Sequence, residues 1–334
     1  MNDELQFQQQ AEEFRGRYHA VKDEVGKVIV GHDEIVHGVL TCLMIGGHCL
    51  LEGAPGLGKT LLVSTLSKTL SLDSNRIQFT PDLMPADILG TNMIVEHPDT
   101  GARSFQFQHG PIFTQICLAD EVNRATPKTQ SAMLETMQEG TVTVGGVRYE
   151  LKKPFFVMAT QNPIEQEGTY PLPEAQLDRF LFKLNVGYSN REQLSEILDR
   201  TTRGTNVEPQ PVMDGEEILK WQALNRQVIL ADHLRDYIVR LTLATHADGP
   251  LATDITNQYL RWGASPRGAQ TIVLASKVRA LLEGRYNVSF EDIRRVYLPA
   301  MRHRVVLNFE AQAEGITADQ VLLEILDRVS EKAE

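Results

Sequence analysis

The sequence has little of what would direct a chain into a membrane or through an oxidising compartment. Its 334 residues include three cysteines, and no two of them form a CxxC pair, so a disulfide framework is not expected. No apolar run approaches the roughly 18 residues of a membrane span, because the best candidate, residues 36–51, is interrupted by glycine, histidine and threonine. The opening MNDELQFQQQ is acidic and rich in glutamine, unlike a secretory signal. These absences predict a cytoplasmic protein without a transmembrane segment.

Basic charge is also scarce relative to acidic charge. Lysine and arginine number 33 against 44 aspartate and glutamate residues, which gives a net charge of −11. A general nucleic-acid coat needs a basic surface to displace counterions, so this balance disfavours one, although a local basic stripe is compatible with it. What the sequence does contain is 42% apolar residues, enough for a substantial core. Its length predicts two domains or one large one, at about 150 residues per domain.

Apolar runs in the first half of the chain alternate with helical patterns. Within the runs the apolar character is continuous, as expected for strands of a parallel sheet that is covered on both faces. This order predicts an α/β domain in which a parallel sheet has helices on both faces. The expected strands are residues 48–51, 76–80, 116–119, 155–160 and 180–186, and the expected helices are residues 5–28, 33–45, 61–70 and 126–138.

Two β-hairpins are expected as insertions in this alternation. The first joins strand-like runs within residues 92–108 through the turn-rich segment HPDTGAR. The second joins runs within residues 141–151 through Gly145 and Gly146, and two glycines between strand-like runs are a strong hairpin signal. We therefore expect both hairpins to interrupt the α/β alternation without belonging to it.

Strand patterns stop after Gly187, and helix signals replace them. Ser189 and Glu192 have the spacing of a capping box, in which each side chain bonds the backbone N–H of the other at a helix start. The segment 208–212 contains two prolines and is expected to be a linker. The sequence therefore predicts N-terminal helices and an α/β core over residues 1–187, followed by an all-helical lid domain over residues 188–334. Further helix starts are indicated at Ser265 before Pro266, at Ser289, and at Thr317 with Gln320, and Gly284 marks a helix end.

Residues 53–60, GAPGLGKT, match the phosphate-binding pattern GxxxxGK(S/T) at every fixed position. Glycines let the backbone wrap closely enough for its N–H groups to hold phosphates, Lys59 would reach the β and γ oxygens, and Thr60 would bind Mg²⁺. An ordinary glycine turn would not need the strand before it and the helix after it that are expected here. The segment therefore indicates a nucleotide site. Its candidate binding residues are Gly53, Ala54, Pro55, Gly56, Leu57, Gly58, Lys59, Thr60 and Leu61.

Polar residues also end two later strands. Asp120 and Glu121 follow the strand at 116–119, so Asp120 could hold Mg²⁺ and Glu121 could polarise an attacking water. Two acids at a strand end are often only a helix cap, but a phosphate-binding loop about 60 residues earlier favours the catalytic interpretation, and the glutamate favours hydrolysis over a timed switch. Asn162 ends the next strand, where its amide could bind the γ-phosphate or orient the water, although Asn–Pro can also simply start a turn.

These three motifs together resemble a AAA+ ATPase, and longer runs resemble the MoxR family within that group. The motifs are GAPGLGKT at 53–60, DEVNR at 120–124 and ATQNP at 159–163. The similarity extends from about Val28 to Ile316, and the two hairpins resemble the helix-2 insert and the pre-sensor hairpin of this clade. The runs that carry the MoxR resemblance are IEQEGTYPLPEAQLDRFLF at 164–182, FTPDLMPADILG at 79–90, GPIF at 110–113 and RHRVVLNFEAQAEGI at 302–316.

The resemblance implies further roles by position. Asn162 matches sensor 1, and Arg179 in LDRF matches the arginine finger that reaches the γ-phosphate of a neighbouring subunit, with a surface pair between Asp178 and Arg179 as the plainer alternative. Arg124 is a rival or second trans-acting arginine. Arg267 in SPRG matches sensor 2, acting in its own subunit or in the next, and a plain surface arginine is again the alternative. The remaining matches are Val30, Gly31 and His32 beside adenine, and Gln78 as a residue that could restrain Glu121.

The resemblance implies an ATPase that binds ATP or ADP with Mg²⁺ and forms a homo-oligomeric ring, with a hexamer expected, because the finger acts across a subunit boundary. MoxR relatives are regarded as chaperone-like factors that mature client proteins, often with a partner that carries a von Willebrand factor A domain. A DNA-acting motor is the leading alternative, but the charge of −11 disfavours it, as does a hairpin tip where only Arg148 is basic nearby. Two further alternatives are the motor subunit of a metal chelatase and a nucleotide-binding scaffold without turnover.

Overall fold

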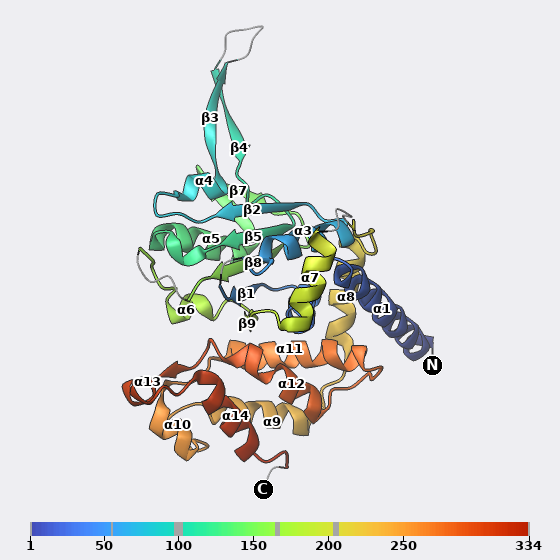
Figure 1. Ribbon diagram of the computed structural model, residues 1–334, viewed down its shortest axis with the longest axis vertical. Helices are drawn as coiled ribbons and strands as arrows, with labels where there is room; N and C mark the ends of the chain where they lie inside the picture. Colours follow the sequence, from blue (N-terminus) through green and yellow to red (C-terminus); the bar gives the residue numbers. More distant parts are fainter. Residues whose placement is uncertain (1, 55, 97–102, 164–167, 203–206, 333–334) are drawn as a thin grey trace.

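The computed structural model of the chain contains a five-stranded parallel sheet between layers of helices, with a helical unit below it (Figure 1). It describes residues 2–54, 56–96, 103–163, 168–202 and 207–332. The strands of the sheet are β1 (Cys49–Glu52), β2 (Ser74–Gln78), β5 (Ile116–Asp120), β8 (Phe156–Gln161) and β9 (Phe182–Asn185). Their order is β2-β5-β8-β1-β9, and every neighbouring pair is parallel, which confirms the predicted fold class.

Each central strand is buried on both faces because its side chains alternate between two hydrophobic clusters. In β1, Cys49 and Leu51 join the larger cluster, while Leu50 belongs to the smaller one on the opposite side of the sheet. The side chains of β5 and β8 alternate in the same way. This burial on both faces explains why the central strands are continuous apolar runs in the sequence. The loops that follow these strands therefore begin from well-packed positions.

The core helices occupy the positions that the sequence predicted, with small shifts at their ends. The helix expected at residues 33–45 is found with those bounds and ends at Gly46, whose φ of 85° is typical of a helix C-terminus. The helix after the glycine-rich loop begins at Lys59 rather than Leu61, so its first turn continues the loop directly. The helices of this part are α1 (Asn2–Gly26), α2 (Asp33–Ile45), α3 (Lys59–Thr69), α4 (Pro85–Leu89), the 3₁₀ turn Val122–Arg124, α5 (Pro127–Glu139) and α6 (Glu174–Leu177).

The first predicted hairpin is present and projects far from the sheet (Figure 1). It pairs β3 (Gly90–Glu96) antiparallel with β4 (Arg103–His109). Ile94 lies opposite Phe105 in this ladder, and both side chains are exposed. The connection at residues 97–102, which forms most of the HPDTGAR segment, lies outside the described residues. The hairpin therefore presents apolar side chains well away from the core.

The second predicted hairpin packs against the base of the first. Its strands β6 (Thr141–Val144) and β7 (Val147–Glu150) are joined by Gly145–Gly146, whose φ angles of 58° and 81° suit a two-residue turn. The ring of Tyr149 in this hairpin stacks on the ring of Phe107 in the first, with 4.2 Å between their centroids. The two insertions are thus joined by aromatic packing.

The second part of the chain is helical apart from one antiparallel pair, β10 (Leu260–Trp262) with β11 (Val306–Leu307). The predicted helix starts at Ser265, Ser289 and Thr317 are confirmed, because each hydroxyl accepts a hydrogen bond from a backbone N–H of the first turn. The helices of this part are α7 (Arg191–Thr202), α8 (Gly215–Gln227), α9 (Asp232–Leu243), α10 (Asp254–Tyr259), α11 (Pro266–Leu282), α12 (Phe290–Met301), α13 (Phe309–Glu314) and α14 (Ala318–Arg328).

One predicted helix start is wrong by one residue. The capping box of α7 consists of Asn190 and Gln193, whose side chains each accept the backbone N–H of the other at 2.9 Å, and not of Ser189 and Glu192. Both pairs have the same spacing, so the local pattern does not distinguish them. Gln193 also donates to the carbonyl of Gly31 at 3.3 Å, and this tertiary contact favours the pair that forms.

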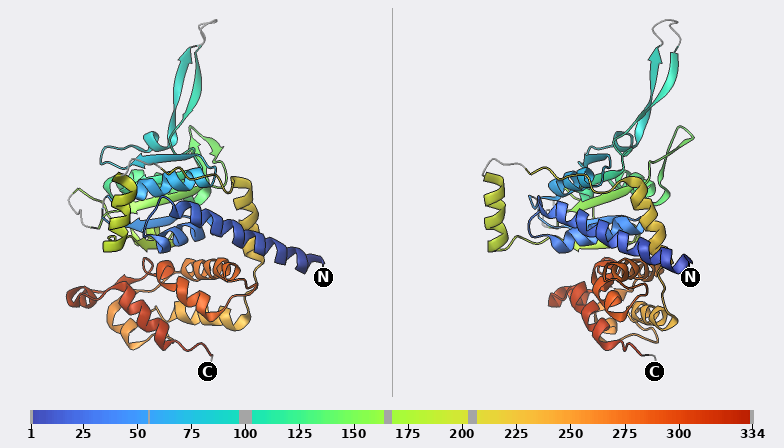
Figure 2. Two further views of the ribbon diagram at one scale, coloured as in Figure 1. Left: turned by 45° about the vertical axis from the view of Figure 1, so that its right-hand side comes forward. Right: turned by 90° about the vertical axis from the view of Figure 1, so that its right-hand side faces the viewer.

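The sheet ends at Asn185, shortly before the predicted domain boundary at Gly187. Helices α7 and α8 nevertheless lie beside the α/β part, whereas α9 to α14 form the lower layer (Figures 1 and 2). The predicted linker at 208–212 is mostly exposed but bound to the α/β part at its end, since the Val212 N–H donates to the carbonyl of Thr69 at 2.8 Å. The division into residues 1–187 and 188–334 therefore stays a prediction.

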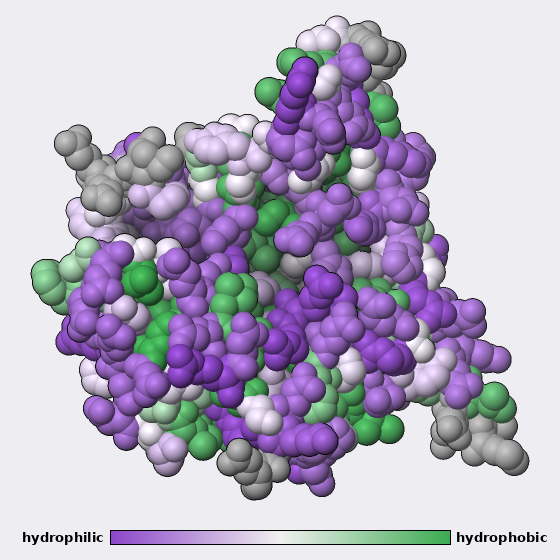
Figure 3. Space-filling model, turned by 60° about the horizontal axis from the view of Figure 1, so that its bottom comes forward, coloured by the Kyte–Doolittle hydropathy of each residue, from purple (hydrophilic) through white to green (hydrophobic). Residues whose placement is uncertain are grey.

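The lower face of the molecule is mostly hydrophilic, with apolar residues in small scattered groups (Figure 3). Isolated apolar side chains are normal on protein surfaces, so this face alone does not indicate a partner. Within the described part of the chain, no helix has both the length and the apolar character that a membrane crossing requires.

Candidate active site

The glycine-rich loop lies between β1 and α3, at the carboxyl end of the parallel sheet. Gly56 and Gly58 have φ angles of 82° and 76°, which suit glycine, and apart from their immediate chain neighbours no described residue has an atom within 4 Å of the place that a Cβ would take on either. Gly53 passes so close to the neighbouring backbone that a Cβ there would lie 2.6 Å from the Val186 carbonyl oxygen. The unpaired N–H groups of the first turn of α3 point out of its N-terminus, which suits an anion. Pro55 lies outside the described residues.

Lys59 is folded back into the loop. Its Nζ donates to the carbonyl of Gly53 at 2.8 Å. Partial burial lowers the pKa of Lys59, while the charges of Asp120 and Glu121 oppose that shift. The ammonium group therefore lies within the electrostatic reach of both acids that the sequence singled out.

Asp120 and Glu121 lie at the end of β5, and the hydroxyl of Thr160 joins them. Thr160 Oγ1 donates to Asp120 Oδ1 at 2.6 Å and accepts the backbone N–H of Glu121 at 2.8 Å. Glu121 has a φ of 57°, a left-handed conformation that is uncommon for residues other than glycine and that clusters at functional sites. The threonine thus restrains the strained backbone that carries the Glu121 carboxylate.

Each acid also has a partner on a neighbouring segment. Arg76 in β2 donates to Asp120 Oδ2 from Nη2 at 2.7 Å and from Nε at 3.0 Å. Glu121 Oε2 accepts from Gln78 Nε2 and from Arg124 Nη1, both at 3.0 Å. The contact between Gln78 and Glu121 that the sequence suggested is therefore present. Arg124, in contrast, pairs with the glutamate of its own subunit.

Asn162 directly follows β8 and is buried, with 5% of its surface exposed. Because β8 lies between β5 and β1, this amide is at the same edge of the sheet as the acids and the glycine-rich loop. The backbone N–H of Gly53 donates to the carbonyl of Gln161 at 3.2 Å, so the loop and the end of β8 are in direct contact. The three predicted motifs therefore meet at one end of the sheet.

An apolar cavity of about 370 Å³ opens beside the loop. Val30 and His32 line it, as do Leu194 and Ile197 of α7. The contribution of α7 to this cavity was not predicted from the sequence, because an apolar helix face usually indicates core packing. No residue of α7 is buried, so its apolar face forms a cavity wall instead. Gly31 lies next to this wall through its hydrogen bond with Gln193.

The two arginines that resemble trans-acting residues lie together in a second cavity, of about 430 Å³. Arg179 lines it from the segment after α6, and Arg267 lines it from the first turn of α11. Among the residues that the structure describes, the lining of this cavity shares no member with the lining of the apolar cavity beside the loop. Among the described residues, the buried Nε of Arg179 has no hydrogen-bond partner, and Arg267 approaches Asp178 only to 3.9 Å. Neither guanidinium group therefore forms a close ion pair with a described residue in this cavity.

Two polar partners in this site carried no sequence signal of their own. Threonine is common in strands because β-branched residues favour them, so the hydroxyl of Thr160 did not stand out. Arg76 was expected within a strand, and nothing in the sequence marked it as a partner of Asp120. It shares one strand face with Gln78, because residues two apart in a strand point to the same side. Both act through side chains on neighbouring strands, which a local pattern does not reveal.

Known protein families match the chain in two parts. The ATPase family associated with various cellular activities (AAA) matches residues 48–182, and the AAA lid domain matches residues 252–325. The first match contains the glycine-rich loop, both acids and Arg179, and the second contains Arg267. The chain is therefore an AAA-type ATPase, a class that binds and hydrolyses ATP and is usually oligomeric.

Comparison with individual relatives shows to which family of AAA-type ATPases the chain belongs. Chaperone MoxR1 of Mycobacterium tuberculosis is 42% identical over 307 residues, which cover 92% of this chain and 80% of the relative. The YeaC protein of Bacillus subtilis is 41% identical over 308 residues, 92% of each chain. The crystal structure of a protein from Cytophaga hutchinsonii, assigned as an ATPase, is 40% identical and superposes with a TM-score of 0.91 over 99% of both chains. The chain belongs to the MoxR family of AAA+ ATPases, which confirms the resemblance carried by its motifs.

Proposed function

We propose that the chain is the subunit of a Mg²⁺-dependent ATPase ring that works as a chaperone-like motor on client proteins. The observation that carries this proposal is that the glycine-rich loop and the pair Arg179 and Arg267 line separate cavities on one chain. The loop and the acids form the first half-site, and Arg179 with Arg267 forms the second, in a cavity with a separate lining. In a head-to-tail ring, each interface brings the first half-site of one subunit against the second half-site of the next. A hexamer is the ring size we propose.

The first half-site binds the phosphates. The backbone N–H groups of residues 53–60 and the Lys59 ammonium would hold them, and the open space at Gly56 and Gly58 fits this role. Thr60 and Asp120 offer the oxygen ligands that Mg²⁺ prefers, and the bound ion would neutralise charge on the β- and γ-phosphates. Arg76 now pairs with Asp120, so we infer that it releases this carboxylate when the site is loaded.

Glu121 is proposed as the base that takes a proton from the attacking water, with the Asn162 amide orienting that water. One carboxylate oxygen of Glu121 is occupied by Gln78 and Arg124 in the structure. We infer that these two contacts restrain the base until a neighbouring subunit or a client binds. In this proposal Arg124 acts on its own subunit's glutamate, which leaves Arg179 as the main finger.

The second half-site supplies positive charge to the neighbouring subunit. A fixed guanidinium at a transferring phosphoryl group is worth about 10³–10⁵ in rate. The shared cavity of Arg179 and Arg267 supports a trans role for both, because none of its described lining residues also lines the chain's own loop cavity.

The apolar cavity would take the adenine base. Leu57 and Leu61 of the loop region line it, so the places for phosphates and base are continuous. Val30 contributes its side chain, and the backbone of Gly31, with a φ of 75°, packs so tightly on Gln193 that a side chain there would collide. An apolar enclosure with a polar rim is the usual form of such a pocket.

The projecting hairpin is the proposed contact with the client. Ile94 and Phe105, which lie opposite each other near its end, are 64% and 78% exposed, and a group of exposed apolar side chains on a projecting element suits contact with a partner. The description of one relative as a chaperone supports this role. A partner with a von Willebrand factor A domain and a cytoplasmic location complete the proposal, and three buried free cysteines are compatible with a reducing compartment.

Two substitutions test the catalytic assignment. Glu121→Gln should keep nucleotide binding and abolish turnover, and Arg179→Ala should lower turnover by about 10³-fold or more. Steady-state ATPase assays on assembled protein measure both, with native mass spectrometry to count subunits and a Mg²⁺-free arm to test the ion. Unimpaired turnover in either variant would overturn the role given to that residue.

The Glu121→Gln variant also offers a route to the client. In the presence of ATP it should hold a client that wild-type protein releases, so a pull-down compares the two with and without nucleotide. Strong stimulation of the wild-type ATPase by DNA at physiological salt would favour a DNA-acting motor instead.

A further inference from the structure

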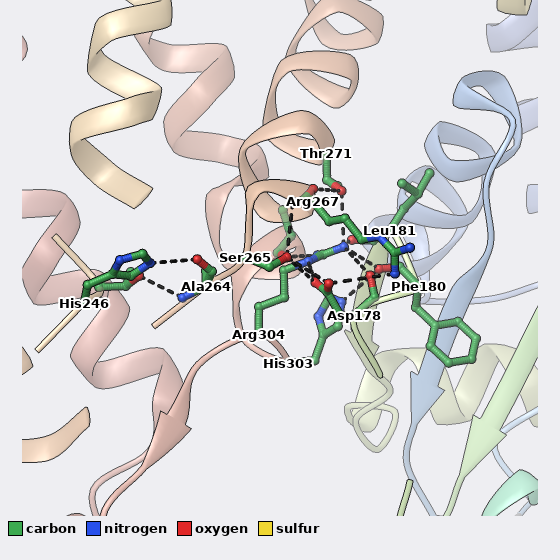
Figure 4. Close-up of polar contacts among 12 residues, drawn as sticks. Asp178, Phe180, Leu181, His246, Ala264, Ser265, Arg267, Thr271, His303 and Arg304 are labelled. Carbon is green, nitrogen blue, oxygen red and sulfur yellow. Dashed lines mark hydrogen bonds and ion pairs between the residues drawn. The ribbon is translucent and has the colours of Figure 1, made fainter. Parts of the chain in front are cut away.

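The segment that carries Arg179 is held by the helical part of the chain as well as by the sheet. It connects α6 to β9, and three residues from the helical part bind it (Figure 4). Ser265 lies at the start of α11, and His303 and Arg304 follow α12. We call Asp178, Ser265 and Arg304 the arginine clamp, because Ser265 and Arg304 bind the side chain of Asp178, the residue directly before Arg179.

Asp178 is the centre of the arginine clamp. Ser265 Oγ lies 2.9 Å from Oδ1 and 2.8 Å from Oδ2 of Asp178, so its single hydroxyl hydrogen is shared between the two oxygens, and Arg304 Nε donates to Oδ1 at 2.9 Å. Arg267 Nη1 lies 3.9 Å from Oδ2. The carboxylate thus connects two parts of the chain that are 87 or more positions apart in sequence.

Arg304 is bound at several of its donors. Its Nη2 donates to the carbonyl of Phe180 at 2.7 Å, and its Nη1 donates to that of Leu181 at 3.0 Å. Burial lowers the pKa of Arg304 to about 10, with the Asp178 charge opposing the shift, so the guanidinium stays charged at neutral pH. With 1% of this side chain exposed, a charged Arg304 needs its carboxylate partner. His303 adds a hydrogen bond from Nε2 to the Phe180 carbonyl at 3.0 Å.

The arginine clamp restrains both trans-acting arginines at once. Arg179 follows Asp178 directly in the chain. Arg267 lies two residues after Ser265, whose Oγ also accepts the backbone N–H of Arg267 at 3.2 Å. One carboxylate therefore restrains the backbones that carry both guanidinium groups. A misplacement of about 1 Å can cost about 10²-fold in rate, so such a restraint has a catalytic consequence.

We propose that Asp178 is a positioning residue that sets the placement of Arg179 relative to Arg267 and so controls hydrolysis in the neighbouring subunit. This rests on the proposed function, in which both arginines act in trans. Asp178 does not itself touch the nucleotide. Without its charge both arginines are still present, but the segment after α6 and the first turn of α11 are free to separate.

Asp178→Asn in the full-length assembled protein is the first test, because it keeps the shape of the side chain and removes its charge. We expect kcat for ATP to fall about 10- to 100-fold, as for a misplaced catalytic group. The Kd for ADP, measured by calorimetry, should stay within about twofold, since the residues of the first half-site are unchanged. A kcat within about twofold of the wild-type value would overturn the proposal.

Mixed rings separate a trans effect from damage within the subunit. Glu121→Gln subunits do not hydrolyse ATP but present normal arginines, so in an equal mixture about half of the Asp178→Asn sites face a normal neighbour. We expect the mixture to recover activity towards about a quarter of the wild-type rate, well above either pure ring. Absence of any recovery would show that the substitution harms its own subunit and would overturn the proposal.

The same mixture made with Arg179→Ala distinguishes this proposal from the proposed function. If Glu121→Gln subunits do not rescue Arg179→Ala, the trans role of Arg179 fails, and the role of Asp178 fails with it. If they rescue Arg179→Ala but not Asp178→Asn, only the positioning role fails. Rescue of both is the expected result.

A second pair of variants keeps the test decisive if Asp178→Asn does not assemble. Ser265→Ala removes the hydroxyl that binds Asp178, whereas Ser265→Thr retains one that can still cap α11. We expect Ser265→Ala to lower kcat by about fivefold or more and Ser265→Thr to keep it near the wild-type value, with Tm recorded for both. Equal kcat values for the two variants would overturn the role of the arginine clamp.

Discussion

Replacing Thr160 with valine should separate the geometry of the acidic pair from the binding of nucleotide. Valine has nearly the shape of threonine and favours strands equally well, so the change removes one hydroxyl without opening a large cavity. Thr160 is fully buried, and that hydroxyl both donates to Asp120 and accepts the Glu121 N–H. Thr160→Val therefore affects both acids through a single atom.

Two lost hydrogen bonds determine how much Thr160→Val lowers the free energy of unfolding. A hydrogen bond to a charged carboxylate is worth about 1.5–3 kcal/mol, and a shielded N–H left without an acceptor costs about 1–3 kcal/mol. Burying a methyl group in place of the hydroxyl offsets about 1 kcal/mol. We expect the free energy of unfolding to fall by about 1.5–5 kcal/mol. Because Glu121 loses a restraint on its left-handed backbone, kcat should fall by about 10²-fold.

Thr160→Ser is the matched control for this prediction. It keeps the hydroxyl and loses a methyl group, so it should cost about 1 kcal/mol of stability and leave kcat near the wild-type value. Chemical denaturation gives the free energy of unfolding, steady-state assays give kcat, and calorimetry with ADP shows that binding is retained in both variants. A Thr160→Val protein with the kcat of Thr160→Ser would refute the argument that this hydroxyl positions Glu121.

Three further predictions concern other parts of the molecule. Leu194→Asp places a charge in the apolar cavity and should raise the Kd for ADP about tenfold or more, whereas Leu194→Met should not; calorimetry measures both. Burial lowers the pKa of His37 and of His48 to about 4 each, so between pH 6.5 and 4 the unfolded chain binds protons that the folded chain does not. The free energy of unfolding is therefore highest above about pH 6.5 and falls as the pH is lowered, by roughly 2 kcal/mol per histidine at pH 5. Urea unfolding measures it, and equal free energies of unfolding at pH 7 and pH 5 would contradict the prediction. Phe107→Ala and Tyr149→Ala should show a coupling of about 0.5–1.5 kcal/mol in a double-mutant cycle of unfolding, and strictly additive effects would show that the two hairpins are not joined by this stack.

Most of the fold could be predicted because its signals are local. A strand that is buried on both faces must be apolar there, and the first four residues of β5, at 116–119, leave such a continuous run in the sequence. The turn at Gly145–Gly146 needs positive φ at both positions, which the residue type reports directly. The start of α7 was not predictable in this way, because two overlapping pairs give the same capping pattern and the contact between Gln193 and Gly31 distinguishes them.

The candidate site could be predicted as far as it is contiguous in sequence. The glycine-rich loop and the acidic pair are short motifs with fixed spacing, so they are visible without a structure. Thr160 and Arg76 were not visible, because each acts on Asp120 from a neighbouring strand of the sheet. The wall formed by α7 was also hidden, since an apolar helix face has the same pattern whether it covers a core or a cavity.

The two arginines illustrate a different limit of sequence-based prediction, because the role proposed for them depends on a contact between subunits. The sequence left open whether Arg267 acts on its own nucleotide or on the next one. In the fold, Arg267 lies in one cavity with Arg179, and the contacts of Asp178 hold the two segments together. The net charge of the chain, −11, gives no sign of this local pair of basic residues. If the two arginines serve one nucleotide, they serve it from the same side, and that side is not the one that holds the chain's own glycine-rich loop. In the proposed ring, activity would then be a property of the interface, because each subunit would contribute one half to each of two different sites.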